Sequence, residues 1–174
     1  MPARDLIFLD ESGANLQMVP LYGRGYSGER VVKAVPFNRG KSFTMLSAIS
    51  FTKVEAAVYG EWAANGEIFL EFIKKCLCPV LQARHVVVMD NVAFHKVSGV
   101  KEAVELTGAK LIYLPPYSPD LNPIEQMWSK IKTCLRKESA RTVSKFASSI
   151  KIAFTNIEES DLKNWYGHCG YQAP

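Results

Sequence analysis

The chain has 174 residues, of which 48% are hydrophobic and 22% are charged, and its net charge is +4. These values predict a single globular domain over residues 1–174 and exclude a disordered or fibrous protein. No apolar run reaches the roughly 18–20 residues of a membrane span, and Leu6 to Leu9 is too short a run for a secretory signal, so we expect a cytoplasmic protein.

Strands dominate the first third of the chain. Residues 5–10, DLIFLD, form an apolar run without alternation, which is typical of a strand buried on both faces. Residues 11–28 are rich in Gly, Ser and Asn and are predicted to form a loop, and RVVKAV at 30–35 is predicted as a short strand. Residues 43–50 and 54–60 are predicted as an antiparallel pair because the short segment between them suits a hairpin.

Helices and strands alternate over the rest of the chain. Helices are predicted over residues 67–78, over 97–107 with Gly108 as the cap, from Pro123 onward and over 142–156. Further strands are predicted at 85–90, HVVVMD, and at 109–114, while 157–174 reads as irregular or weakly helical. This order predicts an α/β fold with a mixed sheet, in which strand 85–90 lies parallel to strand 5–10.

Asp10 and Asp90 each end a predicted buried strand. If these strands are parallel neighbours, both acids lie at the same carboxyl-end edge, where open α/β sheets bind their ligands. Strands are about 4.8 Å apart, so the two carboxylates could share a cation, and without one their repulsion would raise a pKa. The alternative is structural, because Asp is common at strand ends and Asp90 with Asn91 suits the start of a turn.

Glu125 is the third candidate acid. Asn122 suits an N-cap, Pro123 the first helical position and Glu125 the glutamate of a capping box, which is the structural alternative. The same geometry presents a carboxylate that the helix dipole keeps ionised. Three carboxylates on two strand ends and a helix start suit Mg²⁺ or Mn²⁺, and beside a polyanion the natural chemistry is two-metal phosphoryl transfer.

The basic residues cluster towards the C-terminus. Residues 1–128 contain 13 Lys/Arg and 13 Asp/Glu, whereas residues 129–174 contain 8 and 4. Such a basic segment favours a polyanion partner, although a solvated helix face would leave the same pattern. The candidates for contacts with nucleic-acid phosphates are Arg24, Arg39, Lys41, Lys130, Lys132, Arg136 and Lys137.

Three polar residues are candidates to support the acids. His95 follows Asp90 closely and could contact a phosphate or orient a carboxylate, or it could be a capping or surface residue. Asn91 could hydrogen-bond near the site or merely begin a turn, and Asn122 is the third.

Two short motifs do not support a cofactor. Residues 23–28, GRGYSG, match G-x-G-x-x-G, but a dinucleotide-binding motif directly follows a strand and opens a helix, and this one does neither. We therefore predict no nucleotide cofactor. The four cysteines lack the spacing of a zinc site, so we expect reduced thiols.

Three longer motifs resemble those of a known family. FLDESG at 8–13, VVMDNVAFHK at 87–96 and LPPYSPDLNPIEQMWSKIK at 114–132 resemble the catalytic domain of IS630/Tc1/mariner-type transposases, and 34 residues separate Asp90 from Glu125. The resemblance implies an RNase H-like fold with strand order 3-2-1-4-5 and a DDE site of Asp10, Asp90 and Glu125 that binds two Mg²⁺ or Mn²⁺ ions. It also implies hydrolysis at transposon ends and transfer of the freed 3′-hydroxyl into target DNA, typically at TA.

The resemblance further implies partners. These are double-stranded DNA and a second copy of the chain when assembled on DNA, and in a bacterium we expect a location at the nucleoid. Family members carry an N-terminal helix-turn-helix domain, for which this chain has no room, so we expect a truncated protein or a second reading frame whose upstream product supplies that domain. Two alternatives remain open: a non-catalytic DNA-binding accessory or degenerate fragment that uses the basic helical part, about 123–174, and a related RNase H-like nuclease.

Overall fold

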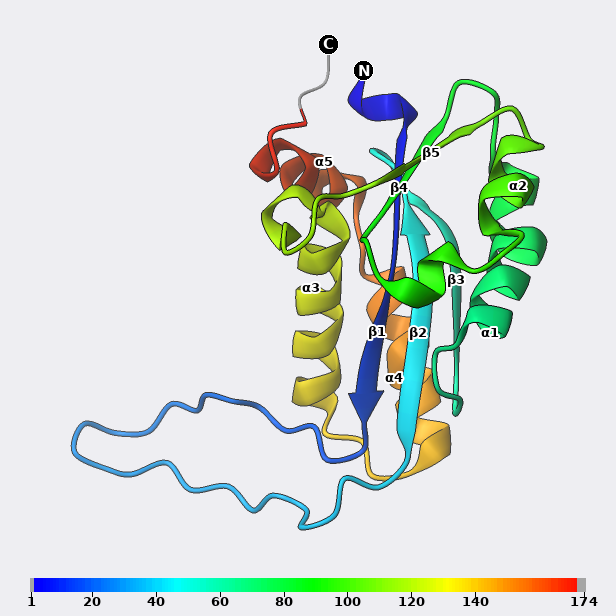
Figure 1. Ribbon diagram of the computed structural model, residues 1–174. Coiled ribbons are helices and arrows are strands. Elements are labelled where there is room, and N and C mark those ends of the chain that lie inside the picture. The colour runs from blue at the N-terminus through cyan, green and yellow to red at the C-terminus, as the bar shows by residue number, and fades with distance from the viewer. Residues whose placement is uncertain (1, 172–174) are drawn as a thin grey trace.

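A computed structural model gives the structure of residues 2–171, which is built around a five-stranded sheet (Figure 1). The strands are β1 (Leu6–Asn15), β2 (Ser42–Ile49), β3 (Val54–Gly60), β4 (Val86–Met89) and β5 (Lys110–Tyr113). Their order is β3-β2-β1-β4-β5, which confirms the predicted order 3-2-1-4-5. The β1–β2 and β2–β3 pairs are antiparallel, whereas β4 is parallel to both β1 and β5. The sheet is therefore mixed, and its parallel half contains the two strands predicted to carry the aspartates.

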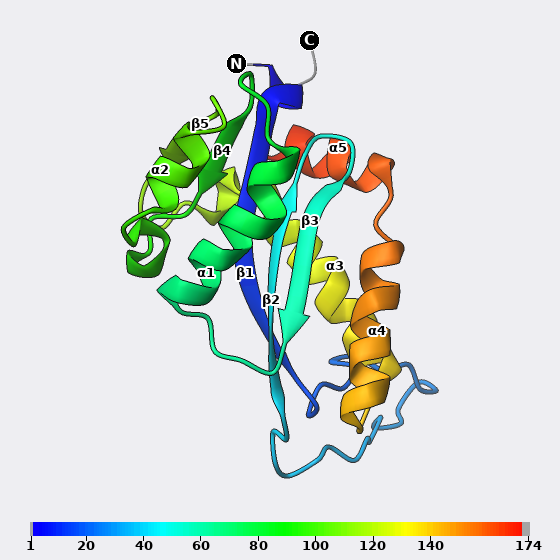
Figure 2. The ribbon, with the colours of Figure 1, turned by 90° about the vertical axis from the view of Figure 1, so that its right-hand side faces the viewer.

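Helices cover both faces of the sheet (Figures 1 and 2). One face is covered by α1 (Gly66–Phe72) and α2 (Val100–Glu105), and the other by α3 (Pro123–Glu138), α4 (Val143–Thr155) and α5 (Glu159–His168). Alternation along β1 separates two hydrophobic cores, because Leu6 and Phe8 pack with α3–α5 while Ile7 and Leu9 pack with α1 and α2. Within the described residues, no helix combines the length and apolar character needed to cross a membrane.

Strand β1 is longer than predicted, and the predicted loop over residues 11–28 is wrong in its first part. Residues 11–15 continue the strand and pair with β2, for example Gly13 with Thr44 and Asn15 with Ser42. Their Gly, Ser and Asn content disfavours a strand locally. Pairing of residues 11–15 with strand β2 outweighs this unfavourable local propensity.

A long arm, defined here as residues 16–41, connects β1 to β2 and projects from the body (Figure 1). The predicted strand at 30–35 is wrong, because this segment is extended without a sheet partner and the side chains of Val31 and Val32 are exposed. β-branched residues favour a strand only where a neighbouring strand receives them. Arg141 fixes the base of the arm by donating to the main-chain oxygen of Leu16 at 2.7 Å and to that of Met18 at 3.1 Å.

The helices follow the predicted pattern, except in the first of them. The helix predicted over 67–78 is α-helical only to Phe72, and continues as a π-helical turn, Ile73–Leu77, and a 3-10 turn, Cys78–Val80. Of the two alternatives predicted for 157–174, irregular or weakly helical, the structure has the helix, α5, over Glu159–His168. Leu162 and Tyr166, one helical turn apart, are buried there, and the Tyr166 hydroxyl lies 3.1 Å from main-chain oxygens of both β1 and β2.

Candidate active site

Asp10 and Asp90 lie at the same level of the sheet. Leu9 pairs with Met89 at the end of the parallel β1–β4 ladder, and the next residue along each strand is the aspartate. The two aspartates therefore lie side by side, as predicted. For Asp10, however, the reason is not the end of its strand. Only β4 ends here, because β1 continues along β2 to Asn15.

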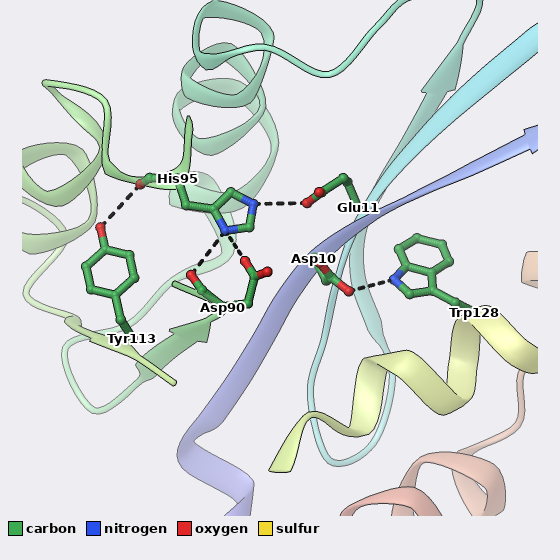
Figure 3. Close-up of polar contacts among 6 residues, drawn as sticks. All are labelled: Asp10, Glu11, Asp90, His95, Tyr113 and Trp128. Carbon is green, nitrogen blue, oxygen red and sulfur yellow. Dashed lines mark hydrogen bonds and ion pairs between the residues drawn. The ribbon is translucent and has the colours of Figure 1, made fainter. Parts of the chain in front are cut away.

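Asp10 is a buried carboxyl group surrounded by other acids. Its side chain faces α3, where Trp128 Nε1 donates to Oδ2 at 3.2 Å, and the residue is 5% exposed (Figure 3). Burial raises the pKa of Asp10 to about 8, the negative charge of Glu11 adds to this increase, and Glu125 and Asp90 contribute further. Each of these three carboxylates is thus close enough to repel a charge on Asp10.

His95 joins two of the acids (Figure 3). Its Nε2 lies 3.0 Å from Glu11 Oε2, while Nδ1 forms an ion pair with Asp90 Oδ1 at 2.5 Å and a hydrogen bond with the Asp90 main-chain oxygen at 3.3 Å. The ring is fully buried and stacks on Phe69 with centroids 4.3 Å apart. Burial lowers the pKa of His95, but the hydrogen bonds to Asp90 and Glu11 outweigh it and raise the pKa to about 9. The imidazolium therefore neutralises part of the negative charge at neutral pH.

The position of His95 differs from the surface setting that was one of its predicted alternatives. The ring is buried, and its two nitrogens contact Glu11 and Asp90. Tyr113 on β5 fixes the same segment, because its hydroxyl donates to the main-chain oxygen of His95 at 3.2 Å.

Glu11 is the residue of this site that sequence reasoning missed. The loop predicted over residues 11–28 includes it, whereas β1 continues through it. Alternation along a strand then sends Asp10 towards α3 and Glu11 towards the opposite face, where His95 lies. The sequence signal was present as two consecutive acids after a buried run, but using it requires the correct strand end.

Glu125 lies in the first turn of α3 and is exposed. The capping box that was its structural alternative is not formed. The Asn122 side chain makes no capping hydrogen bond, and the Asn122 N–H instead donates to the Pro119 oxygen at 3.0 Å. Glu125 therefore leaves its carboxylate free of a capping role.

A cavity of about 370 Å³ lies between the end of β4 and the start of α3. Among the residues lining it are Asp90, Asn91, Pro116, Tyr117, Asn122 and Glu125. The cavity brings the predicted candidates Asn91 and Asn122 beside two of the three acids. Asn122 is 3% exposed, and its Oδ1 is buried without a hydrogen-bond partner among the described residues.

The chemistry of these residues fits a divalent cation. Carboxylate oxygens are preferred ligands of Mg²⁺ and Mn²⁺, and a cation would offset both the burial and the repulsion that raise the pKa of Asp10. Trp128 engages one oxygen of Asp10 and His95 one oxygen of Asp90, so each aspartate keeps a second oxygen. Over residues 2–171, no three or more His, Cys, Asp or Glu side chains are arranged as a ligand group.

The basic residues predicted to contact DNA phosphates differ in their ion pairs and in their place in the fold. Lys41 pairs with Glu61 at 2.5 Å and Lys130 pairs with Asp161, so both charges are partly neutralised. The candidates without an ion pair in the described part of the chain are Arg24, Arg39, Lys132, Arg136 and Lys137. Arg24 and Arg39 lie on the exposed arm, and the other three on α3.

Comparison with known proteins identifies similar families and folds. A family model described as DDE superfamily endonuclease matches residues 5–147. A crystal structure of the Mos1 strand transfer complex matches with a TM-score of 0.78 and 15% identity over 96% of this chain and 52% of that chain. The Mos1 transposase paired-end complex with the left transposon end matches with a TM-score of 0.79 and 14% identity over the same shares. No match was found among curated protein sequences.

The catalytic domain alone gives a more complete match. A structure of the Mos1 transposase catalytic domain with raltegravir and Mn has a TM-score of 0.71 and 10% identity over 96% of this chain and 78% of that chain. This likeness confirms the predicted RNase H-like fold. The present chain spans about half the length of the Mos1 chains in the two DNA complexes.

Proposed function

We propose, because this chain belongs to the DDE superfamily endonucleases, that it is the catalytic domain of a transposase that hydrolyses DNA at transposon ends and transfers the freed 3′-hydroxyl into target DNA, typically at TA. The observation that carries this proposal is that Asp10 and Asp90 directly follow paired residues of neighbouring parallel strands, while Asp90 and Glu125 line the same cavity. The likeness to Mos1 in strand transfer and paired-end complexes supports it.

In this proposal Asp10, Asp90 and Glu125 hold two divalent cations, Mg²⁺ or Mn²⁺. When bound, such ions activate the attacking oxygen and stabilise the leaving oxygen in phosphoryl transfer. The protein's own contribution is to fix the carboxylates beforehand. Trp128 from α3 holds Asp10, and His95 holds Asp90, so neither aspartate has to be ordered when DNA arrives.

The proposal is tested by incubating the purified chain with supercoiled plasmid and with duplexes that carry the element's ends, with Mg²⁺ or with EDTA. We expect nicking or cleavage that requires the cation, and joining of a 3′-hydroxyl end to a second DNA. Cleavage without joining would identify a nuclease, and binding without cleavage would identify an accessory or degenerate fragment. Either result would overturn the proposal.

Glu11 and His95 are proposed to act on Asp90 as positioning residues. We expect Glu11→Gln to slow Mg²⁺-dependent DNA cleavage by about 10–100-fold and to weaken Mn²⁺ binding, because partners of metal ligands have effects of this size. The amide is nearly the same size but can no longer form the ion pair with the His95 ring. Calorimetric Mn²⁺ titration and initial cleavage rates measure the two effects.

Glu138→Gln is the matched control, since Glu138 is exposed at the end of α3. It should leave both cleavage and Mn²⁺ binding unchanged. A Glu11→Gln protein that cleaves as fast as the wild type would show that the Glu11–His95 contact does not serve the site.

The unpaired basic residues of α3 are proposed to contact DNA phosphates. Replacing Lys132, Arg136 or Lys137 by Ala should weaken binding to all duplex sequences alike and flatten the dependence of log K on log salt by roughly 0.9 per lost contact. Lys130→Ala should change this slope less, because Lys130 already pairs with Asp161. Fluorescence anisotropy at several salt concentrations measures the slope, and equal slopes in all variants would assign the α3 residues to a solvated face.

A further inference from the structure

Tyr171 joins the strand of one candidate acid to the turn before another. Its hydroxyl donates to the main-chain oxygen of Leu121 at 2.8 Å, and its ring lies against that of Phe8 with the two centroids 5.0 Å apart. Phe8 belongs to β1, and Leu121 belongs to the 3-10 turn Pro119–Leu121 just before α3. One side chain therefore contacts both the strand of the first acid and the turn that precedes the third.

The end of α5 directs Tyr171 to this place. Gly170 has a φ of 83°, in the left-handed region that glycine adopts without strain, and it turns the chain back after the helix. The Tyr171 N–H then donates to the Tyr166 oxygen at 2.8 Å, and the two tyrosine rings are 6.2 Å apart. This hydrogen bond and this apolar contact are those of a Schellman motif, so the backbone fixes Tyr171 as well as its ring does.

Each contact of Tyr171 lies close to an acid. Phe8 and Asp10 are two positions apart on β1, so their side chains leave the same face of the sheet, where α3 packs. On the other side, the Glu125 N–H donates to the Asn122 oxygen at 3.1 Å, which ties the first turn of α3 to the residue after Leu121. A displacement of the turn would therefore carry Glu125 with it.

The loop before α3, residues 115–122, depends on this contact for its attachment. Over residues 2–171, its other hydrogen bonds are internal or go to the start of α3, such as that from Ser118 Oγ to the Pro116 oxygen at 3.4 Å. Five of its eight residues are exposed, so packing holds little of it. The hydroxyl of Tyr171 thus supplies the hydrogen bond that ties this loop to the body of the protein.

We propose that Tyr171 is a positioning residue that sets Glu125 relative to Asp10, because it ties the turn before α3 to β1. This inference rests on the proposed function, since it takes the two acids as cation ligands. It goes further by giving the segment after α5 a part in a site whose cavity it does not line. Mg²⁺ and Mn²⁺ sites need their ligands closely placed, so a looser Glu125 weakens cation binding.

The test measures Mn²⁺ affinity by calorimetric titration of the full chain without DNA, at a temperature where every variant is folded. Tyr171→Phe keeps the ring and removes the hydroxyl, and it should weaken Mn²⁺ binding by roughly 2- to 10-fold, the range that one net hydrogen bond provides. The Asn122 main-chain N–H should also exchange faster with deuterium, because the turn opens more often. An unchanged Mn²⁺ affinity in Tyr171→Phe would overturn the inference.

Tyr166→Phe is the matched control. It also removes a tyrosine hydroxyl beside Phe8, but this hydroxyl is buried against main-chain oxygens of β1 and β2 rather than against the turn before α3. Its loss should lower the melting temperature and leave Mn²⁺ affinity unchanged. Equal weakening of Mn²⁺ binding in both variants would show a general loss of core stability, and the positioning role would be wrong.

A double variant tests whether Tyr171 acts through Glu125. In a Glu125→Gln chain, which lacks the carboxylate, the additional change Tyr171→Phe should not weaken Mn²⁺ binding further, because residues that act as one unit are not additive. If the additional change weakened Mn²⁺ binding by the same factor as in the wild type, Tyr171 would act by another route and the inference would fail.

The outcomes distinguish the two proposals. If the wild type cleaves DNA with Mg²⁺ but Tyr171→Phe keeps the wild-type Mn²⁺ affinity, the role of Tyr171 is wrong and the proposed function stands. If Tyr171→Phe weakens Mn²⁺ binding while the wild type cleaves no DNA, the role of Tyr171 stands and the proposed function is overturned. A wild type that binds no Mn²⁺ would overturn both.

Discussion

Replacing Asp90 by asparagine is expected to slow Mg²⁺-dependent DNA cleavage by more than about 100-fold, because loss of a metal ligand exceeds the 10–100-fold effect of losing a ligand's partner. Asp10→Asn and Glu125→Gln should act alike. Glu125→Gln gives the cleanest result, since the Glu125 side chain is exposed and plays no part in capping α3. Its melting temperature should therefore equal that of the wild type while cleavage is lost. Initial rates of plasmid nicking and thermal unfolding measure the two effects.

Asp120→Asn is the control for this series. Asp120 is an exposed carboxylate in the 3-10 turn just before α3, and it does not line the cavity. It should retain wild-type cleavage. If Asp120→Asn were as inactive as Glu125→Gln, the loss would reflect net charge near the DNA rather than cation binding. If Glu125→Gln kept its activity, Glu125 would be excluded from the catalytic set.

Asp10→Asn is expected to stabilise the fold in the absence of metal, and increasingly so as the pH rises. The folded-state pKa of Asp10 is about 8, above its ordinary value of 3.8, so the native state favours the protonated carboxyl. The stabilising contribution of the protonated Asp10 carboxyl is fully present below the pKa that this group has in the unfolded state. It is lost as the pH rises through the folded-state pKa of about 8. At about 1.36 kcal/mol per unit of pKa difference, the penalty in the wild type at high pH amounts to several kcal/mol.

Urea unfolding of both proteins between about pH 5 and pH 9 measures this effect. The difference in unfolding free energy should grow with pH, and the contribution of His95, whose pKa is also raised, is present in both proteins and largely cancels. Mg²⁺ should stabilise the wild type more than Asp10→Asn, because ligands that bind the native state stabilise it. A difference independent of pH would show that Asp10 ionises normally.

The sequence predicted the central part of the fold because the signals there are local and strong. The apolar runs before Asp10 and Asp90 are typical of buried strands, and the predicted helix before the second run favours a parallel crossover between them. Proline and asparagine at the start of α3 likewise placed Glu125 correctly. The two strands and the place of Glu125 could therefore be predicted without knowledge of tertiary contacts.

The errors arose where tertiary pairing decides the structure. Residues 30–35 have strand-forming side chains but no neighbour, and residues 11–15 have poor strand formers but pair with β2. The same error concealed Glu11, because its contact with His95 joins residues 84 positions apart in the sequence. Likewise, the partners of Lys41 and Lys130 depend on side-chain geometry, which spacing along the chain does not specify.

The pinned base of the arm has a consequence for chain-length variation. The arm leaves the sheet at Asn15 and returns at Ser42, which are paired residues, and Arg141 holds its first residues to the body. The arm also contacts the body within its length, because Leu16 and Met18 pack against the core and Lys33 Nζ donates to Ser139 Oγ at 3.4 Å. In the exposed segment 23–30, between these contacts, added residues affect folding through the entropy of loop closure, and doubling a loop costs about 0.6 kcal/mol. Insertions in this segment are therefore expected to be nearly neutral for stability, whereas deletions that remove Leu16, Met18 or Lys33 are not.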